Sequence, residues 1–263
     1  MPQFHDSFPP RLQKWALQQP VFFTASAPLR GRHVNLSPKG RPAATFAVLG
    51  ANRAAYLDLT GSGAETISHV YENGRVTVMF CSFAGPPRIL RLFCTGRVVE
   101  CDDVPRFESV VGEMGKGNVV GTRAVIVLDI WKVQTSCGLA VPTLKTVDDA
   151  PGTDTESNSL SNQASLPHKG FDERHGLEKW LVNQVNKKAL DAYRVKANSR
   201  SLDGLPGLRA ARKMGGEWVV VEEIMAHLKS VFWHPEALCL GIVIGVLLAW
   251  SFPAVKINSW KFG

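Results

Sequence analysis

A glycine-rich turn that leads into a helix is the first feature of the sequence suited to chemistry. Residues Thr60 to Gly63 (TGSG) precede a stretch whose apolar residues, from Ile67 to Tyr71, follow helical spacing. Backbone N–H groups at the start of a helix attract anions, so this turn is able to bind a phosphate or a carboxylate. A structural interpretation stands beside this one, because Ser62 and Glu65 have the pattern of a capping box that satisfies free backbone amides.

An arginine within an apolar run is the second candidate. Arg91 alternates with Ile89 and Phe93, so the three side chains share one face of the predicted strand. Such an arginine either lines a ligand cleft or faces solvent on a sheet that is buried on one side only. The sequence alone leaves both interpretations open.

The sequence offers little for metal binding or nucleophilic catalysis. The cysteines are odd in number and none stands at C-x-x-C spacing, so neither a zinc site nor a disulfide framework is predicted, and a reducing compartment fits best. We interpret His33 and His69 as structural or exposed, because neither has a carboxylate or cysteine at ligand spacing. No G-x-S-x-G turn is present. The five cysteines are Cys81, Cys94, Cys101, Cys137 and Cys239.

The charge balance favours an anionic partner. The net charge is +7 and the isoelectric point is near 9.3. A phosphorylated cofactor, an anionic lipid surface and nucleic acid all meet that description. Nucleic acid is the least favoured of the three, because the sequence has no dense run of Lys and Arg with interleaved aromatic residues.

Runs of strand-forming residues separated by turns occupy the N-terminal half of the chain. One helix interrupts them and ends at Asn73-Gly74, since glycine readily takes the left-handed conformation of a helix stop. Six or seven strands with one or two short helices favour an antiparallel barrel over a doubly wound sheet. The predicted strands are Val21 to Ala25, Arg32 to Ser37, Thr45 to Leu49, Ala54 to Leu59, Val76 to Phe83, Ile89 to Glu100 and Arg123 to Gln134.

The composition changes beyond the predicted strands. Asp148 to His168 is rich in small polar residues and predicts a linker. A helical region follows, with one apolar face from Leu177 to Tyr193 and a short helix from Val219 to Leu228. Ala237 to Val255 carries no charge over 19 residues, and this length predicts a transmembrane helix. The alternative is a buried C-terminal helix or pair of strands.

Four sequence blocks stand in a specific order and spacing. They are GRHVNLSPKG (Gly31 to Gly40), AYLDLTGSGAET (Ala55 to Thr66), ENGRVTVMFCSFAGPPRILRLFCTGRVVE (Glu72 to Glu100) and VQTSCG (Val133 to Gly138). Together they resemble the pyridoxamine 5′-phosphate oxidase-like superfamily, in an uncharacterised branch rather than the biosynthetic oxidase itself. Leu202 to Leu208 also resembles a C-terminal block of that branch. The resemblance implies a split β-barrel, a homodimer, and FMN in a cleft at the subunit interface.

The resemblance also implies a set of flavin contacts, since the FMN phosphate needs cations and backbone N–H donors. The biosynthetic oxidases carry an Arg-Lys pair near the glycine-rich turn, where this chain has Ala64 and Glu65. A deazaflavin or another flavin-like ligand is therefore an alternative to FMN. No side chain stands out as a catalytic acid or base, and no metal is expected. The expected cofactor contacts are Arg32, Asn35, Ser37, Lys39, Thr60, Gly61, Ser62, Arg88 and Arg91.

The predicted fold is mainly β with helices: a split β-barrel of the FMN-binding type, a helical C-terminal region and a C-terminal transmembrane helix. The predicted division is residues 1–147 for the barrel, 148–170 for a polar linker, 171–230 for the helical region and 231–263 for a membrane anchor. The N-terminus lacks the apolar stretch of a secretory signal, so the barrel is expected in the cytoplasm, anchored to an intracellular membrane.

Three functions fit this reading of the sequence. The first is an FMN-dependent oxidoreductase that acts on a small molecule. The second is a protein that binds flavin or a related cofactor without turnover, which the missing substrate-binding residues of the biosynthetic oxidases favour. The third is a membrane-attached barrel that has lost its ligand, which the acidic Glu65 favours.

Overall fold

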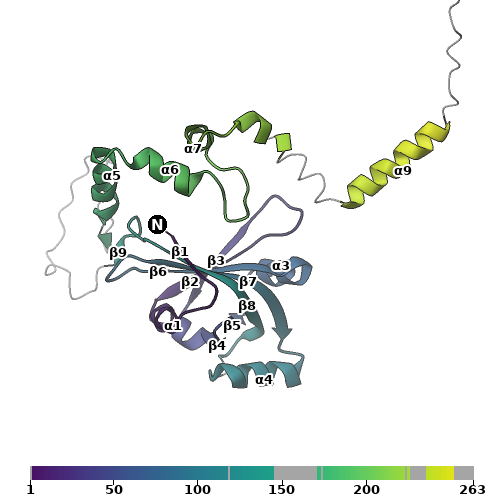
Figure 1. Cartoon of the computed structure of the whole chain (residues 1–263). Helices are drawn as coiled ribbons and strands as arrows, with labels where there is room; N and C mark the ends of the chain where they lie inside the picture. Colours follow the sequence, from purple (N-terminus) through teal and green to yellow (C-terminus); the bar gives the residue numbers. More distant parts are fainter. Residues whose placement is uncertain are drawn as a thin grey trace, which may run out of the picture. The chain divides into compact units, whose positions relative to one another are not determined.

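The computed structural model describes residues 2–117, 119–144, 171–172, 174–222, 224–225 and 235–251. The chain divides into two compact units, Met1–Lys179 and Trp180–Gly263 (Figure 1). The first unit contains β1 (Gln3–His5), α1 (Pro10–Leu17), β2 (Val21–Ser26), β3 (Asn35–Gly40), α2 (Pro42–Thr45), β4 (Phe46–Gly50), β5 (Arg53–Leu59), α3 (Glu65–Asn73), β6 (Arg75–Cys81), β7 (Ile89–Glu100), α4 (Val104–Met114), β8 (Thr122–Ser136), β9 (Thr143–Leu144) and β10 (Phe171–Asp172).

The first unit is built on an eight-stranded antiparallel sheet. The strand order is β3-β2-β6-β7-β8-β5-β4, and β1 pairs with β8. The sheet curls so that its two ends approach each other. Phe22 of β2, the strand next to the edge strand β3, packs edge-on against Phe46 of the edge strand β4, with ring centroids 5.4 Å apart. The edge strands β3 and β4 follow each other in the chain through α2. This open, curled sheet fits the predicted mainly-β split barrel.

The sequence pattern located most strands correctly, and β7 has the predicted bounds. The clearest shift is at β3, predicted from Arg32 to Ser37 but observed from Asn35 to Gly40. Pro38 is tolerated because β3 is an edge strand, where a missing backbone N–H needs no partner strand. The chain turns one residue later, at Arg41, which has a left-handed φ of 52°.

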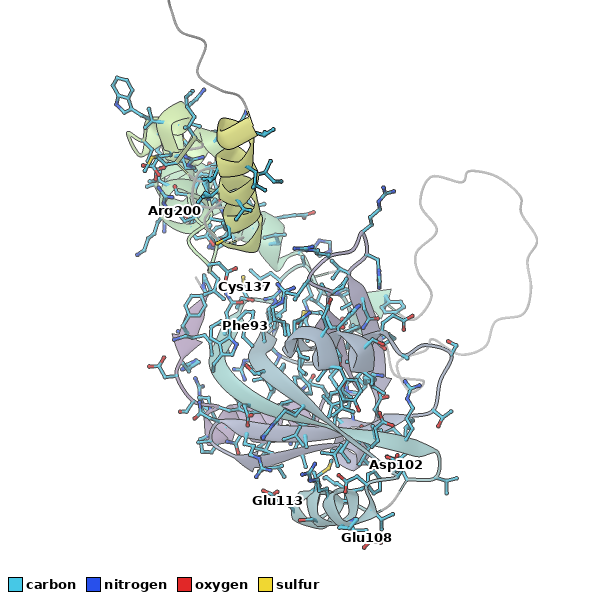
Figure 2. The ribbon with its side chains drawn as sticks, turned by 90° about the vertical axis from the view of Figure 1, so that its right-hand side faces the viewer. Phe93, Asp102, Glu108, Glu113, Cys137 and Arg200 are labelled. Carbon is cyan, nitrogen blue, oxygen red and sulfur yellow. The ribbon has the colours of Figure 1, made fainter. Side chains whose placement is uncertain are left out.

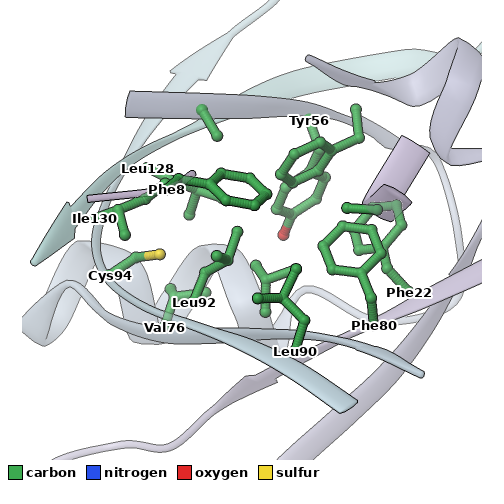
Figure 3. Close-up of a cluster of buried hydrophobic side chains, with 14 of the residues drawn as sticks. Phe8, Phe22, Tyr56, Val76, Phe80, Leu90, Leu92, Cys94, Leu128 and Ile130 are labelled. Carbon is green, nitrogen blue, oxygen red and sulfur yellow. The ribbon is translucent and has the colours of Figure 1, made fainter. Parts of the chain in front are cut away.

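The barrel interior is filled by alternating side chains of the strands. Figure 3 shows aromatic and aliphatic residues of this cluster around Tyr56. A second, smaller cluster packs α4 against β4, β5 and β8 through Phe107 and Met114. An ion pair of 2.6 Å between Arg53 and Glu113 adds a polar tie from β5 to α4, on which Figure 2 labels Glu108 and Glu113.

Helix α3 confirms one predicted terminus and corrects the other. It ends at Gly74, whose φ of 70° is the expected left-handed stop. It begins at Glu65 after Ala64, and no side chain caps it, so the predicted capping box of Ser62 and Glu65 is wrong. The Glu65 carboxylate lies instead over Gly63, in the space that a side chain would occupy there.

The chain on both sides of residues 145–170 belongs to the barrel unit. The polar linker predicted at 148–170 lies outside the described residues. Leu144 of β9 pairs with Phe171 of β10. The guanidinium of Arg174 donates to the carbonyl oxygens of Val141 and Gly85, each at 2.8 Å. A residue without a side chain is required at position 138, because a Cβ added to Gly138 would come within 2.8 Å of the Arg88 backbone.

The second unit is helical. Its elements are the end of α5 (Gly176–Asn186), α6 (Leu190–Asn198), α7 (Arg209–Met214) and α9 (Pro235–Ser251). The apolar face predicted from Leu177 to Tyr193 is divided between α5 and α6, which are separated near Lys188 with its φ of 51°. Trp180 and Tyr193 still pack edge-on across this break, with ring centroids 5.0 Å apart. Of the helix predicted from Val219 to Leu228, residues 219–222 and 224–225 are described and helical.

The predicted C-terminal transmembrane helix is wrong. In the part of the chain that the structure describes, no helix is both long and apolar enough to span a membrane. Helix α9 has 17 residues, which at 1.5 Å per residue gives about 26 Å, short of the roughly 30 Å of a bilayer's hydrocarbon core. The rest of the predicted segment, residues 252–255, lies outside the described residues.

Candidate functional site

Three of the predicted ligand residues form one row on β3. Asn35, Ser37 and Lys39 alternate along the strand and are half-buried, whereas Leu36 and Pro38 between them are exposed. Across the ladder the three lie opposite Ser26, Thr24 and Phe22 of β2, which are all buried. Because opposite residues in a ladder share a face, the row lies on the core-facing side of the sheet.

The row ends in a cluster of three charged side chains, Lys39, Asp58 and Arg123, which we call the Asp58 cluster. Lys39 Nζ donates to Asp58 Oδ1 at 3.0 Å, and Arg123 Nε donates to Oδ2 at 2.8 Å. The carboxylate is 1% exposed, and the side chains of Lys39 and Arg123 are 22% and 28% exposed. Strands β3, β5 and β8 each contribute one member, so the cluster exists only once the sheet has formed.

The Asp58 cluster has the properties of an anion-binding site. A buried carboxylate is stable when it is paired and hydrogen-bonded, and Asp58 has both partners. Two cations against one carboxylate leave a net positive charge. An ammonium group has three donors and a guanidinium five, and the bonds to Asp58 and Gly63 use one and two of them. Partly exposed cations with unused donors suit a phosphate or a carboxylate.

The glycine-rich turn lies next to this cluster. Arg123 Nη2 donates to the carbonyl oxygen of Gly63 at 2.7 Å, which connects β8 to the start of α3. Thr60 is held in place, since its backbone N–H and its hydroxyl both donate to the Gly121 carbonyl. Gly61 and Ser62 are exposed. The Glu65 carboxylate over Gly63 repels an anion at the helix start, so the cations of the Asp58 cluster are the better phosphate donors.

A neutral polar network occupies the other end of the row. Asn35 Nδ2 donates to Ser26 Oγ at 3.2 Å and to Thr66 Oγ1 at 2.9 Å. Ser26 Oγ also pairs with His69 Nδ1 at 3.0 Å. Ser26, Thr66 and His69 are buried, and the exposed His33 ring lies against His69 with centroids 5.3 Å apart. Sequence reasoning identified His69 as structural or exposed, and the structure shows it buried in this network.

Arg91 lies on the opposite side of the sheet from the β3 row, and Arg88 precedes β7. Arg91 follows the buried Leu90 and precedes the buried Leu92, so its side chain points away from the core. It makes long contacts of 3.4 Å with Gln134 and Ser136, and the Arg88 guanidinium lies over the Trp15 ring at 5.3 Å. Arg32 is exposed in the loop before β3. One copy of the chain therefore does not bring all nine predicted contacts together.

The buried hydroxyl groups of Tyr56 and Thr24 lie on the core side of the row on β3. Tyr56 and Thr24 are both fully buried, and neither hydroxyl has a hydrogen-bond partner of good geometry among the residues that the structure describes. Burial, and secondarily the charge of Asp58, raises the pKa of Tyr56 far above its usual range. The tyrosine hydroxyl is thus neutral and points into the apolar cluster, as Figure 3 shows.

Asp58 and Arg123 are the site residues that sequence reasoning missed. A signal was present, because Asp58 is the single acid in the apolar strand YLDL and an unpaired acid there would be costly. Its partners are 19 and 65 residues away in the chain, which the sequence pattern does not reveal. No group of three or more His, Cys, Asp or Glu residues suited to a metal ion occurs in the described ranges.

Comparisons with known proteins identify the family. The family profile described as pyridoxamine 5′-phosphate oxidase matches residues 8–137. A relative from Aspergillus flavus, the pyridoxamine 5′-phosphate oxidase family protein ustO, is 51% identical over 219 residues, which are 83% of this chain and 83% of the relative. The chain belongs to the pyridoxamine 5′-phosphate oxidase family. The match to the relative is longer than the span 8–137, so the similarity between this chain and the relative extends beyond the barrel.

Solved structures with low sequence identity are also similar to this chain. HupZ from group A Streptococcus is 14% identical, with a TM-score of 0.37 over 49% of this chain and 99% of the other. The FAD and heme binding protein from Mycobacterium smegmatis is 14% identical, with a TM-score of 0.33 over 64% of this chain and 98% of the other.

Proposed function

We propose that this member of the pyridoxamine 5′-phosphate oxidase family binds FMN along β3 and uses it as an oxidoreductase acting on a small molecule. The observation that carries the proposal is the Asp58 cluster, which keeps two partly exposed cations beside a row of polar side chains. Family membership supports the same conclusion.

The residues present fit such a ligand. FMN is a phosphate dianion joined by a ribityl chain to a planar ring that forms hydrogen bonds. Lys39 and Arg123 offer charge-assisted donors for the phosphate. Asn35 and Ser37, on the same face of β3, offer hydrogen bonds for the ring and the ribityl chain. Asn35 and Lys39 are four positions apart along the strand, a span of about 13 Å at 3.3 Å per residue.

A bound flavin supplies hydride or electron transfer, and the protein's part is to hold and orient it and to exclude competing reactions. Here Lys39 and Arg123 bind the charged end, while Asp58 fixes both cations in place. Asn35 is held by two hydrogen bonds and therefore presents a fixed orientation to the ligand. A deazaflavin carries the same phosphate and a similar ring, and it is the alternative ligand.

Flavin binding without turnover is the second candidate function. One observation favours it: the Asp58 carboxylate, the nearest acidic group to the row, is paired with two cations. Both of its oxygens already accept a hydrogen bond from these cations. The two functions differ in whether the bound flavin exchanges electrons with a substrate.

A homodimer is part of the proposal. Arg91 lies on the face opposite to Lys39, so a single chain is unable to offer both to one ligand. A second copy that presents its outer face to the β3 row of the first would bring the two together. Sedimentation equilibrium of the FMN-loaded chain is expected to give twice the monomer mass, and a monomeric holoprotein would remove Arg91 from the site.

The central test is FMN affinity of the full chain, measured by the quenching of flavin fluorescence. A hydrogen bond to a charged group contributes roughly 1.5–3 kcal/mol, so Lys39→Met and Arg123→Met are each expected to weaken FMN binding by about 10- to 100-fold. Lys132→Met is the matched control, because Lys132 is 30% exposed and makes one ion pair, with Asp6 at 2.7 Å. Equal losses in all three variants, or no binding by the native chain, would refute the cluster as the phosphate site.

The position of the phosphate is tested separately with Glu65→Gln. The Glu65 carboxylate lies at the start of α3, where charges contribute roughly 0.3–1 kcal/mol. If the phosphate lies between the Asp58 cluster and this helix, removing the negative charge tightens FMN binding by about two- to fivefold at low salt. An unchanged affinity would move the phosphate away from the turn.

Turnover is tested on the FMN-loaded chain without oxygen. Addition of NADPH or a pyridoxine vitamer is expected to bleach the flavin absorbance, and readmitted oxygen is expected to restore it. A flavin that stays oxidised with every donor, yet is reduced by dithionite, would favour the binding function.

A further inference from the structure

A chain of hydrogen bonds decides which end of the Asn35 amide faces the ligand. Both amide protons of Asn35 are used, one toward Ser26 Oγ and one toward Thr66 Oγ1. An asparagine amide has two donors on nitrogen and an acceptor on oxygen, so the oxygen is the group left over. In the described part of the chain no group donates to Asn35 Oδ1.

The orientation of this amide depends on His69. Ser26 Oγ lies 3.0 Å from His69 Nδ1 and carries one proton. When Nδ1 accepts that proton, Ser26 is left as an acceptor, and an amide nitrogen is the correct partner for it. When Nδ1 carries its own proton, the serine hydroxyl is free to donate instead, and a flipped Asn35 would then present its oxygen to Ser26.

The network is built to hold one of these arrangements. Its members come from β2, β3 and α3, and Ser26, Thr66 and His69 are each about 5% exposed. Buried polar groups strongly prefer to be hydrogen-bonded. When His69 Nδ1 is the acceptor, a flip of Asn35 would set its oxygen against Ser26 Oγ, whose proton is then already donated to His69. The half-buried Asn35 is the member that extends from this buried set to the row on β3.

We propose that His69 is a positioning residue that acts through Ser26 to hold Asn35 with its Oδ1 toward the ligand, so that the site selects a ligand carrying an N–H donor there. The inference rests on the proposed function, because in FMN the ring N–H at N3 is the donor that would bind. Neither His69 nor Ser26 touches the ligand. Their effect is on the direction of one amide group.

The test compares FMN with 3-methyl-FMN, which has the same phosphate and ring but no N–H at N3. Leaving the Asn35 acceptor unpaired costs roughly 1–3 kcal/mol, so the native chain is expected to bind FMN about 5- to 150-fold more tightly than 3-methyl-FMN. Asn35→Ala is expected to bring this ratio close to one. A loss of structure alone would weaken both ligands and leave their ratio unchanged.

The role of His69 is read from the same ratio. His69→Leu removes the acceptor for the Ser26 proton and is expected to lower the ratio several-fold. His69→Asn places a short side chain with an acceptor near the position of Nδ1 and is expected to preserve it. Ser26→Ala keeps the test valid if His69→Leu fails to fold, because loss of the serine oxygen also releases the amide and lowers the ratio.

Two results separate the proposals. If the native chain binds neither ligand, the FMN function itself fails, and this inference falls with it. If the native chain binds FMN but the ratio is near one, or if Asn35→Ala and Ser26→Ala leave the ratio unchanged, FMN binding stands and the positioning role is overturned.

Discussion

The two units of the chain each contain a cluster built around one almost fully buried charge. In the barrel the buried charge is Asp58, and two basic side chains surround it. In the second unit it is Arg212, 1% exposed, whose Nε donates to Glu217 at 3.0 Å. Arg200 joins the same group through Glu217 and Glu222, each at 3.1 Å. We call this set the Arg212 network.

The two clusters differ in the net charge that remains after their ion pairs are counted. Among the residues that the structure describes, the Arg212 network sets two arginines against two glutamates, in equal number. It lies beside a tight turn, in which Arg200 pairs with Pro206 and Gly207 packs against the Asn198 carbonyl. Its role is therefore to hold that turn. The Asp58 cluster has one more cation than it needs, which suits a cluster that also binds a ligand.

The largest effect is expected from Asp58→Asn, which removes the buried charge but keeps the shape of the side chain. Breaking a buried pair by removing one partner costs roughly 3–5 kcal/mol, and we expect the lower end, about 3 kcal/mol, because both cations are partly exposed. The measurement is the free energy of urea unfolding of the full chain, monitored by a spectroscopic signal that reports on the barrel.

Asp129→Asn is the matched control for this prediction. Asp129 lies on β8, its side chain is 49% exposed, and its partner is Arg97 at 3.1 Å. An exposed pair of this kind contributes about 0–1 kcal/mol. If Asp58→Asn costs no more than Asp129→Asn, the Asp58 cluster is not a structural centre, and its contrast with the Arg212 network disappears.

Several element boundaries could be predicted from the sequence alone. Strand β7 could be bounded from sequence because twelve residues of alternating and apolar character are followed by a turn. The stop of α3 at Gly74 followed from local chemistry in the same way. Helix α4 was overlooked although its sequence carries a signal, since proline near its start and Gly115 after its end are typical helix boundaries.

The site was less accessible to sequence reasoning. The family resemblance predicted Asn35, Ser37 and Lys39, and the structure brings these three onto one face. That Lys39 meets Arg123 through Asp58 depends on the register of three strands that are distant in sequence. Alternation with the buried Leu90 and Leu92 turns Arg91 away from the core, but that Lys39 lies on the core-facing side depends on the pairing of β3 with β2. Neither the Asp58 cluster nor the relation of Arg91 to Lys39 therefore follows from periodicity within one strand.

A smaller effect is expected from Tyr56→Phe, which tests the apolar region behind the Asp58 cluster. The Tyr56 hydroxyl is fully buried without a partner of good geometry among the described residues, and such a group costs roughly 1–3 kcal/mol. Its removal is expected to leave stability unchanged or to raise it by about 1 kcal/mol. Urea unfolding measures this change.

The opposite result would be equally informative. A loss of stability in Tyr56→Phe would mean that the hydroxyl does have a partner in solution, and Thr24 is the nearest one in the described structure. Thr24→Val then serves as the paired variant. Equal, non-additive losses in the two variants would identify a direct hydrogen bond between them.

The smallest effect is expected from acidification of the Arg212 network. The hydrogen bond from Arg212, followed by the charge of Arg200, lowers the pKa of Glu217 below its usual range. A lowered pKa in the folded state means that the stabilisation is present above the unfolded pKa of about 4.3 and is lost as the pH falls through the folded value. Hydrogen exchange of the amides at 198–217, corrected for intrinsic rates, is therefore expected to accelerate below about pH 4.5, with the β7 amides as the internal reference. In Glu217→Gln this acceleration is expected to become smaller, because the carboxylate that pairs with Arg212 no longer titrates and Glu222 contacts only Arg200 among the described residues of the network. If the variant keeps the full acceleration, the turn is held by contacts other than the Arg212–Glu217 ion pair, and the role assigned to the network is refuted.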